Sequence, residues 1–382
     1  MATEVVAAAA EPRFAMPTQP YRLPSYSPPY PVVINPHFSS TVFRERIDRW
    51  LKQLKVDTIF SPKIYKMLVD MDVSGLPARI FTEASELGLE WSCKFFLMLW
   101  IWDDTLDSTD TGKSPEAALS PLLEVHLMMM WSFPDDPVLR TRLEPFLNHL
   151  EGPAREEKTR HVESVLAEAR TKPGTVYPKP ILDIICNVYL ELWKDVVTTA
   201  SPEFCLRLAH YNQQWFLGIL KETENRKFKT LPSSIEHYIE IRKGSSAVPP
   251  TVVLVDFVYG LNTPDSWFYS PEMQRIVEAI NDIVSWHNDI WSFKREVLVE
   301  KDSFNMVLAI SVHRKVSYNE AADITLRMIY ERIADLEQAA RELESVSPPE
   351  YMHNFDLYML TGYQAHMTDI SNLCAINNWY IS

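Results

Sequence analysis

The segment Phe95-Phe-Leu-Met-Leu-Trp100-Ile-Trp-Asp103-Asp104-Thr-Leu-Asp107 joins eight consecutive apolar residues to an acidic cluster. The surrounding residues 83–107 form a long apolar stretch with polar breaks, which predicts a buried helix rather than a strand. Only 9 glycines occur in 382 residues, and an alternating β pattern is scarce. We therefore expect the body of the protein to be all-α.

The acidic cluster points to a metal site at the end of this helix. Asp103 and Asp107 are four residues apart and share one helical face, where two carboxylates repel unless something offsets their charge. Phe96, Leu99 and Trp100 lie on the same stripe one and two turns earlier, so we expect the carboxylates at the mouth of an apolar cavity. Such oxygen ligands suit a hard cation such as Mg²⁺. The alternative interpretation is a solvated helix end.

A second polar stripe lies in the segment Asn288-Asp-Ile-Trp-Ser292-Phe-Lys-Arg295-Glu296. Asn288, Ser292 and Glu296 follow each other at intervals of four, so at about 100° per residue they form one line on a helix. An amide oxygen, a hydroxyl and a carboxylate can chelate a hard cation, and a chance polar face is the alternative. The earlier Asn281-Asp282 with Ser285 looks like a second copy of this ladder, and we discount it as a metal site.

The first 38 residues differ from the rest of the chain. Eight prolines fall between Pro12 and Pro36, which predicts an extended arm that Tyr21, Tyr26 and Tyr30 could pin to a surface. We therefore divide the chain into this arm, residues 1–38, and one helical domain, residues 39–382. Helices are expected over residues 41–53, 83–107, 183–198, 202–229, 235–242, 265–297 with a break near Pro271, 319–343 and 349–378.

Charge and cysteine content argue against several other classes. The formal net charge of −14 disfavours a nucleic-acid partner, which would need a basic face. The 4 cysteines are far apart without a CxxC pair, so no zinc site or disulfide framework is expected and a cytoplasmic location is the default. No apolar run approaches the roughly 18 residues of a membrane span. Nucleophile-elbow, zincin, P-loop and dinucleotide-binding motifs are lacking.

Together, the DDxxD segment at Asp103 and the NDxxSxxxE segment at Asn288 resemble the motifs of class I terpene synthases, in particular the single-domain sesquiterpene cyclases of fungi. The resemblance runs from about Val32 to the end of the chain. The second motif is the more specific, because chain-elongating prenyltransferases also carry DDxxD. The resemblance implies one all-α helical bundle around a central apolar cavity. It also implies that three Mg²⁺ ions hold the substrate diphosphate and assist its departure.

The resemblance also implies roles for individual residues. Asp103 becomes a bridging metal ligand with Asp107 in support, and Asn288, Ser292 and Glu296 become ligands of a further ion. The cavity candidates remain Phe96, Leu99 and Trp100.

Further residues are implied to contact the diphosphate. The family carries an arginine 46 residues before the motif's asparagine, and here that residue is Arg242. Its planar guanidinium suits contact with phosphate, and an exposed arginine near a helix end is the alternative interpretation. Arg295 takes the place of a lysine next to the motif's glutamate. At the C-terminus, Tyr380 matches the tyrosine of the family's final Arg-Tyr pair, but Trp379 stands where its arginine is expected.

The implied reaction is Mg²⁺-dependent ionisation and cyclisation of a linear prenyl diphosphate. We expect farnesyl diphosphate as substrate and a sesquiterpene hydrocarbon or alcohol as product. The alternatives are a diterpene cyclase using geranylgeranyl diphosphate, a chain-elongating prenyltransferase, and a prenyl-diphosphate-binding protein with weakened catalysis. The protein is expected to be a monomer or homodimer without nucleic-acid or membrane partners.

Overall fold

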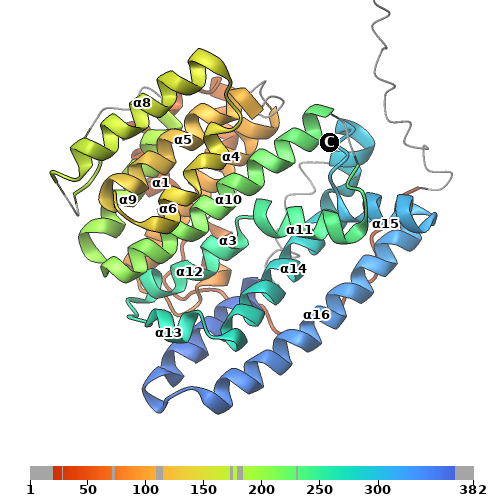
Figure 1. Ribbon diagram of the computed structural model, residues 1–382. Coiled ribbons are helices and arrows are strands. Elements are labelled where there is room, and N and C mark those ends of the chain that lie inside the picture. The colour runs from red at the N-terminus through yellow and green to blue at the C-terminus, as the bar shows by residue number, and fades with distance from the viewer. Residues whose placement is uncertain are drawn as a thin grey trace, which may run out of the picture.

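The computed structural model describes residues 20–27, 29–70, 74–108, 115–172, 175–178, 184–228 and 231–365. Within these ranges every regular element is a helix, which confirms the all-α prediction. Figure 1 shows α8, α5, α9 and α4 gathered on one side, α10 crossing the middle, and α11 to α16 on the other side. None of the described helices combines the length and hydrophobicity that a membrane span requires.

The helices have the following bounds. They are α1 (Ser40–Gln53), α2 (Pro62–Asp70), α3 (Gly75–Ile80), α4 (Glu86–Ser108), α5 (Pro115–Ser132), α6 (Pro137–Thr141), α7 (Leu143–Leu147), α8 (Gly152–Ala169), α9 (Ile184–Thr199), α10 (Pro202–Phe228), α11 (Ile235–Ser245), α12 (Val248–Tyr259), α13 (Asp265–Phe268), α14 (Pro271–Phe293), α15 (Met306–Arg314) and α16 (Tyr318–Val346). A π-helical segment, Lys294–Glu300, continues α14. After a 3-10 turn at Pro349–Tyr351, a last described helix covers residues 352–365.

The helix starts follow ordinary capping chemistry. Ser270 accepts a hydrogen bond from the Met273 N–H ahead of α14, and Pro271 occupies the first turn, where its missing N–H costs nothing. Ser317 and Asn305 cap α16 and α15 in the same way. The expected break near Pro271 is therefore present, because the serine and proline start a new helix after α13.

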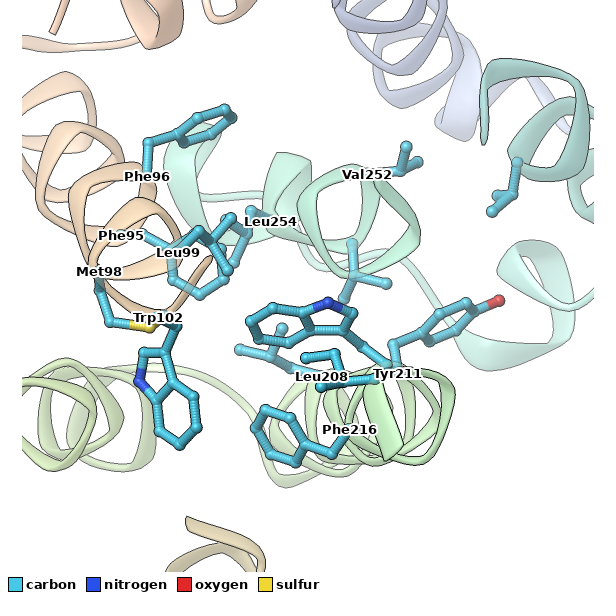
Figure 2. Packing of buried hydrophobic residues seen from close by; sticks show 14 of the residues in the cluster. Phe95, Phe96, Met98, Leu99, Trp102, Leu208, Tyr211, Phe216, Val252 and Leu254 are labelled. Atoms are coloured by element: carbon cyan, nitrogen blue, oxygen red, sulfur yellow. The ribbon is translucent and has the colours of Figure 1, made fainter. Parts of the chain in front are cut away.

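The centre of the molecule is an apolar contact among three helices. Figure 2 shows side chains of α4, among them Leu99 and Trp102, turned toward those of α10 and α12, with Phe216 and Leu254 on the facing side. The rings of Trp102 and Phe216 are stacked with centroids 6.1 Å apart. These residues are all buried, so α4, α10 and α12 form the wall around which the site is built.

α10 and α11 approach each other closely because glycines meet where they touch. A Cβ atom added to Gly218 of α10 would lie only 2.2 Å from the carbonyl carbon of Gly244 in α11. Any side chain at Gly218 would therefore separate the two backbones. This contact fixes the position of the last turn of α11 against α10.

A buried polar cluster ties the same helices together at another point. The guanidinium of Arg207 in α10 lies 2.8 Å from a carboxylate oxygen of Asp256 in α12 and 2.7 Å from one of Asp265 in α13. Arg207 also donates to the Thr263 carbonyl at 2.6 Å, and Tyr358 of the last described helix donates to Asp256 at 3.0 Å. Arg207 and Asp256 are buried and Asp265 is partly exposed, and together with Tyr358 they join four elements, so the cluster positions helices.

Candidate active site

Arg242, in the last turn of α11, lies directly beside the metal-binding ladder predicted on α14. Its Nη2 atom donates to Oδ1 of Asn288 at 3.2 Å and lies 3.2 Å from Oδ1 of Asp289. The structure therefore brings together an arginine and an asparagine 46 positions apart in the chain. The guanidinium is largely buried, with 16% of its side chain exposed.

Asp289 holds this arrangement together. Its second carboxylate oxygen accepts hydrogen bonds from the Tyr238 hydroxyl and from the backbone N–H of Met306, the latter at 3.1 Å. Asp289 thus joins α11, α14 and the start of α15. Sequence reasoning missed both Asp289 and Tyr238. A signal existed for Tyr238, which precedes Arg242 by four residues and so shares its helical face.

The ladder itself is less regular than an uninterrupted α-helix would make it. α14 ends at Phe293, and Glu296 falls in the π-helical segment, where the turns are wider. The prediction that each residue turns by about 100° as far as Glu296 was therefore wrong, because Glu296 lies beyond the end of the regular α-helix. Its carboxylate accepts from the Asn305 side chain at 3.1 Å and lies 3.5 Å from the Arg295 guanidinium.

Ser292 offers a buried oxygen donor that could contact a ligand. Its Oγ atom is shielded from solvent and has no hydrogen-bond partner within the described part of the chain. A buried hydroxyl without a partner is costly, so such groups normally meet a ligand, an ion or a water molecule. An oxygen donor between Asn288 and Glu296 fits a hard divalent cation.

Burial and neighbouring charges shift the pKa values of the site. Burial lowers the pKa of Arg242, but the negative charges of Asp289 and Glu222 outweigh this effect. The pKa therefore lies above its usual value, and the guanidinium stays positively charged. Burial raises the pKa of Asp289 and also that of Glu296, against the opposing effect of nearby arginines. A cation bound beside Glu296 would favour its carboxylate form.

The DDxxD segment lies at the end of α4. The α4 backbone is helical to Ser108, but the side chains of Asp103, Asp104 and Asp107 lie outside the described residues, as do Trp379 and Tyr380. Trp102 touches Phe216 in α10, and Glu222, which faces Arg242, follows Phe216 by six residues, about 9 Å along the helix. α10 thus contacts α4 at Trp102 and faces Arg242 about 9 Å farther along its own axis.

The cavity candidates on α4 are placed as follows. Phe96 and Leu99 are each 6% exposed, and Trp100 is half-buried against the same core. Figure 2 shows Leu99 directed into the space between α4, α10 and α12, whereas Phe96 lies farther from α10.

A break between α11 and α12 begins three residues after Arg242. Ser245 ends α11, its carbonyl accepts from the Trp215 indole at 3.1 Å, and its buried Oγ has no partner in the described chain. Ser246 bonds Asn281 through its hydroxyl, and Asn281 donates to the Lys243 carbonyl at 3.0 Å. Asn281 therefore fixes this break to α14, a structural role that agrees with discounting it as a metal ligand.

A separate cavity of about 1050 Å³ lies at the other end of α4. It is lined by residues near the start of α4 and the end of α12, including Trp91, Lys94 and Phe257. None of the predicted site residues whose side chains the structure describes lines it. This cavity is therefore separate from the place where Arg242 meets the α14 ladder.

Comparison with known proteins agrees with this geometry. Residues 148–335 match the family model of terpene synthase family 2, C-terminal metal binding. Alpha-gurjunene synthase of Marchantia polymorpha is 25% identical over 357 residues, which cover 89% of this chain and 81% of that protein. A 4-epi-cubebol synthase of Streptosporangium roseum, named as cyclising (2E,6E)-farnesyl diphosphate, is 27% identical over 165 residues, or 43% of this chain and 49% of that protein.

The solved structure of hedycaryol synthase has the same fold, with a TM-score of 0.68 at 14% identity, covering 94% of this chain and 100% of that one. The fold and the matched domain define a metal-binding enzyme of the all-α terpenoid synthase class. The chain belongs to the terpene synthase family and is a lyase that acts on prenyl diphosphates.

Proposed function

We propose that this enzyme ionises farnesyl diphosphate and cyclises the resulting allylic cation to a sesquiterpene hydrocarbon or alcohol. The observation that carries the proposal is the meeting of Arg242 with Asn288, one turn from the unpartnered hydroxyl of Ser292. A cationic donor and a set of hard oxygen ligands at one end of an apolar core suit a substrate with a charged head and a hydrocarbon tail.

The residues present fit Mg²⁺. Asn288, Ser292 and Glu296 would hold one ion, and Asp103 with Asp107 would hold the remainder of a set of three. When bound, these ions supply Lewis-acid stabilisation of the departing diphosphate.

The protein's own side chains do the rest of the work. Arg242 already has its guanidinium fixed by Asn288 and Asp289, so it can donate to a diphosphate oxygen without a large rearrangement. Arg295 and Tyr380 are further diphosphate contacts in this proposal. The apolar wall of α4, α10 and α12 excludes water that would capture the cation, and aromatic faces such as that of Trp102 attract it.

The choice of a 15-carbon substrate rests on the relatives. The 4-epi-cubebol synthase is named for farnesyl diphosphate, and the family match includes the half of this chain that carries Arg242 and the ladder. A diterpene cyclase acting on geranylgeranyl diphosphate and a weakly catalytic prenyl-diphosphate-binding protein are the alternatives. A cytoplasmic location and a monomeric or homodimeric state are also proposed. The location is supported by the buried Cys93, Cys186 and Cys205, which form no disulfide within the described residues.

The test supplies Mg²⁺ with geranyl, farnesyl or geranylgeranyl diphosphate separately and analyses an organic overlay by gas chromatography with mass spectrometry. The Asn288→Ala, Ser292→Ala double variant removes two proposed ligands. Ser285→Ala is the matched control, because Ser285 is a buried serine of the same helix whose hydroxyl bonds the Asn281 carbonyl at 2.6 Å.

We expect a cyclic product from farnesyl diphosphate that vanishes in the double variant and persists in Ser285→Ala. A product from geranylgeranyl diphosphate alone would assign a diterpene cyclase. The absence of product from all three substrates, with the protein folded, would leave a binding protein. Full activity of the double variant would remove the ladder from the mechanism.

A further inference from the structure

The described part of the N-terminal arm runs along α16 in a nearly extended form. Arg22 pairs with Asp323 at 2.9 Å, and the Tyr30 hydroxyl donates to Glu337 at 2.8 Å. The two α16 residues are about 21 Å apart along their helix, and the arm's eight-residue step can span at most about 26 Å. Figure 1 shows this segment in red beside α15 and α16.

The arm is clamped at Tyr21. The Asn319 side chain of α16 accepts a hydrogen bond from the Arg22 N–H at 2.9 Å and donates to the Pro20 carbonyl at 3.1 Å. Both peptide groups that flank Tyr21 are therefore held by one side chain. The direction of the tyrosine is fixed as a result.

Tyr21 reaches the outer side of the metal-binding helix. Its hydroxyl donates to the backbone carbonyl of Ile290 at 2.7 Å, and its ring lies 4.6 Å from that of Phe293. Ile290 is midway between Asn288 and Ser292 in the chain. Three residues beyond Ile290, α14 gives way to the π-helical segment that carries Glu296.

We propose that Tyr21 is a positioning residue that fixes the end of α14 from outside, so that the ligands on its inner face keep their mutual geometry. The inference rests on the proposed function, because it assigns the inner face to metal binding. Arg242 holds Asn288 from the inner side, and Tyr21 holds the next turn from the outer side.

The physical need for such support is local. A π-helical turn is less stable than an α-helical turn, so the point of transition is a place where the helix can shift register or unwind. Such a shift would move Glu296 relative to Asn288 and weaken a chelate that depends on all three ligands. A hydrogen bond to the Ile290 carbonyl, together with the Phe293 contact, opposes that movement.

The test compares Tyr21→Phe with Tyr30→Phe in the full chain. Both variants keep the ring and lose one arm hydroxyl, but Tyr30 bonds Glu337 on α16 and so has no hydroxyl contact with α14. The probe is Mg²⁺ titrated in the presence of inorganic diphosphate, with thermal unfolding as the readout. Hydrogen exchange of residues 286–300 is measured without ligand, and Ser292→Ala is the reference for loss of a ligand.

We expect Tyr21→Phe to need about threefold to tenfold more Mg²⁺ for half of the thermal shift, the change expected from one lost hydrogen bond. Hydrogen exchange of residues 286–300 should be faster than in the wild type. Product formation from farnesyl diphosphate should be reduced at low Mg²⁺ and should return to the wild-type rate at saturating Mg²⁺. Tyr30→Phe should match the wild type in all three. Equal exchange and equal Mg²⁺ response in the two variants would overturn the inference. A different outcome would separate the two proposals. If hydrogen exchange is faster in Tyr21→Phe but Mg²⁺ and diphosphate do not shift the thermal unfolding of the wild type, the contact keeps its structural role and the proposed metal function is refuted.

Discussion

His126 should make the protein sensitive to mild acid. It lies in α5 with no solvent exposure, its ring stacks on Phe146 at 5.2 Å, and a ring nitrogen lies 3.0 Å from the Gln213 side-chain nitrogen. Burial lowers its pKa to about 3, far below the value of about 6.5 in an unfolded chain. The folded state therefore keeps His126 neutral at a pH where the unfolded state takes up a proton.

The sign and size of the effect follow from proton linkage. Because the pKa is depressed in the folded state, the stabilisation is present above pH 6.5 and is lost as the pH falls from about 6.5 toward 3. The loss approaches about 1.4 kcal/mol per pH unit, so between pH 7 and pH 5 it should reach roughly 2 kcal/mol.

The assay is urea unfolding of wild type and His126→Leu at pH 7 and pH 5. Leucine cannot titrate, so this variant should lose about 2 kcal/mol less on acidification, whatever its stability at pH 7. His161→Gln is the control, because the His161 side chain is 40% exposed. An equal loss on acidification in wild type and His126→Leu would refute the reasoning.

Two further predictions concern the contacts that position the helices. Asp256→Asn should lower the free energy of unfolding, measured with urea, by roughly 3–5 kcal/mol, because it leaves the buried Arg207 without its buried partner charge. Asp265→Asn should lower it less, because that carboxylate has a side chain 40% exposed, and equal losses in the two variants would contradict this prediction. Gly218→Ala should lower the free energy of unfolding by about 1–3 kcal/mol, because its Cβ would clash with the α11 backbone. Gly244→Ala should be near neutral, because its Cβ would meet only the Gly218 Cα, at 3.4 Å. Equal free energies of unfolding in the two variants would count against this close approach of α10 and α11.

Several features of the protein could be predicted from the sequence because they depend on neighbouring residues. The apolar run before Asp103 predicted α4, and intervals of four predicted that Asn288 and Ser292 share a helical face. The helices expected from periodicity are present within the described residues, with ends that differ by a few positions. Helices such as α5 and α12 were missed, because they are apolar on nearly all sides and show no period.

Other features became visible only in the tertiary structure. The widening after Phe293 changes the ladder at Glu296, and no local pattern announced it. Asp289 owes its role to Tyr238, Arg242 and Met306, which come from two other elements.

The N-terminal arm shows most clearly which features the sequence predicts and which depend on the tertiary structure. The sequence by itself predicted an extended arm, since prolines fix the backbone and remove hydrogen-bond donors, and the described residues 20–27 are extended. Only the fold decided that Tyr21 would meet Ile290, 269 positions away. Backbone preferences act over a few residues, whereas the partner of a side chain depends on which surfaces packing brings together.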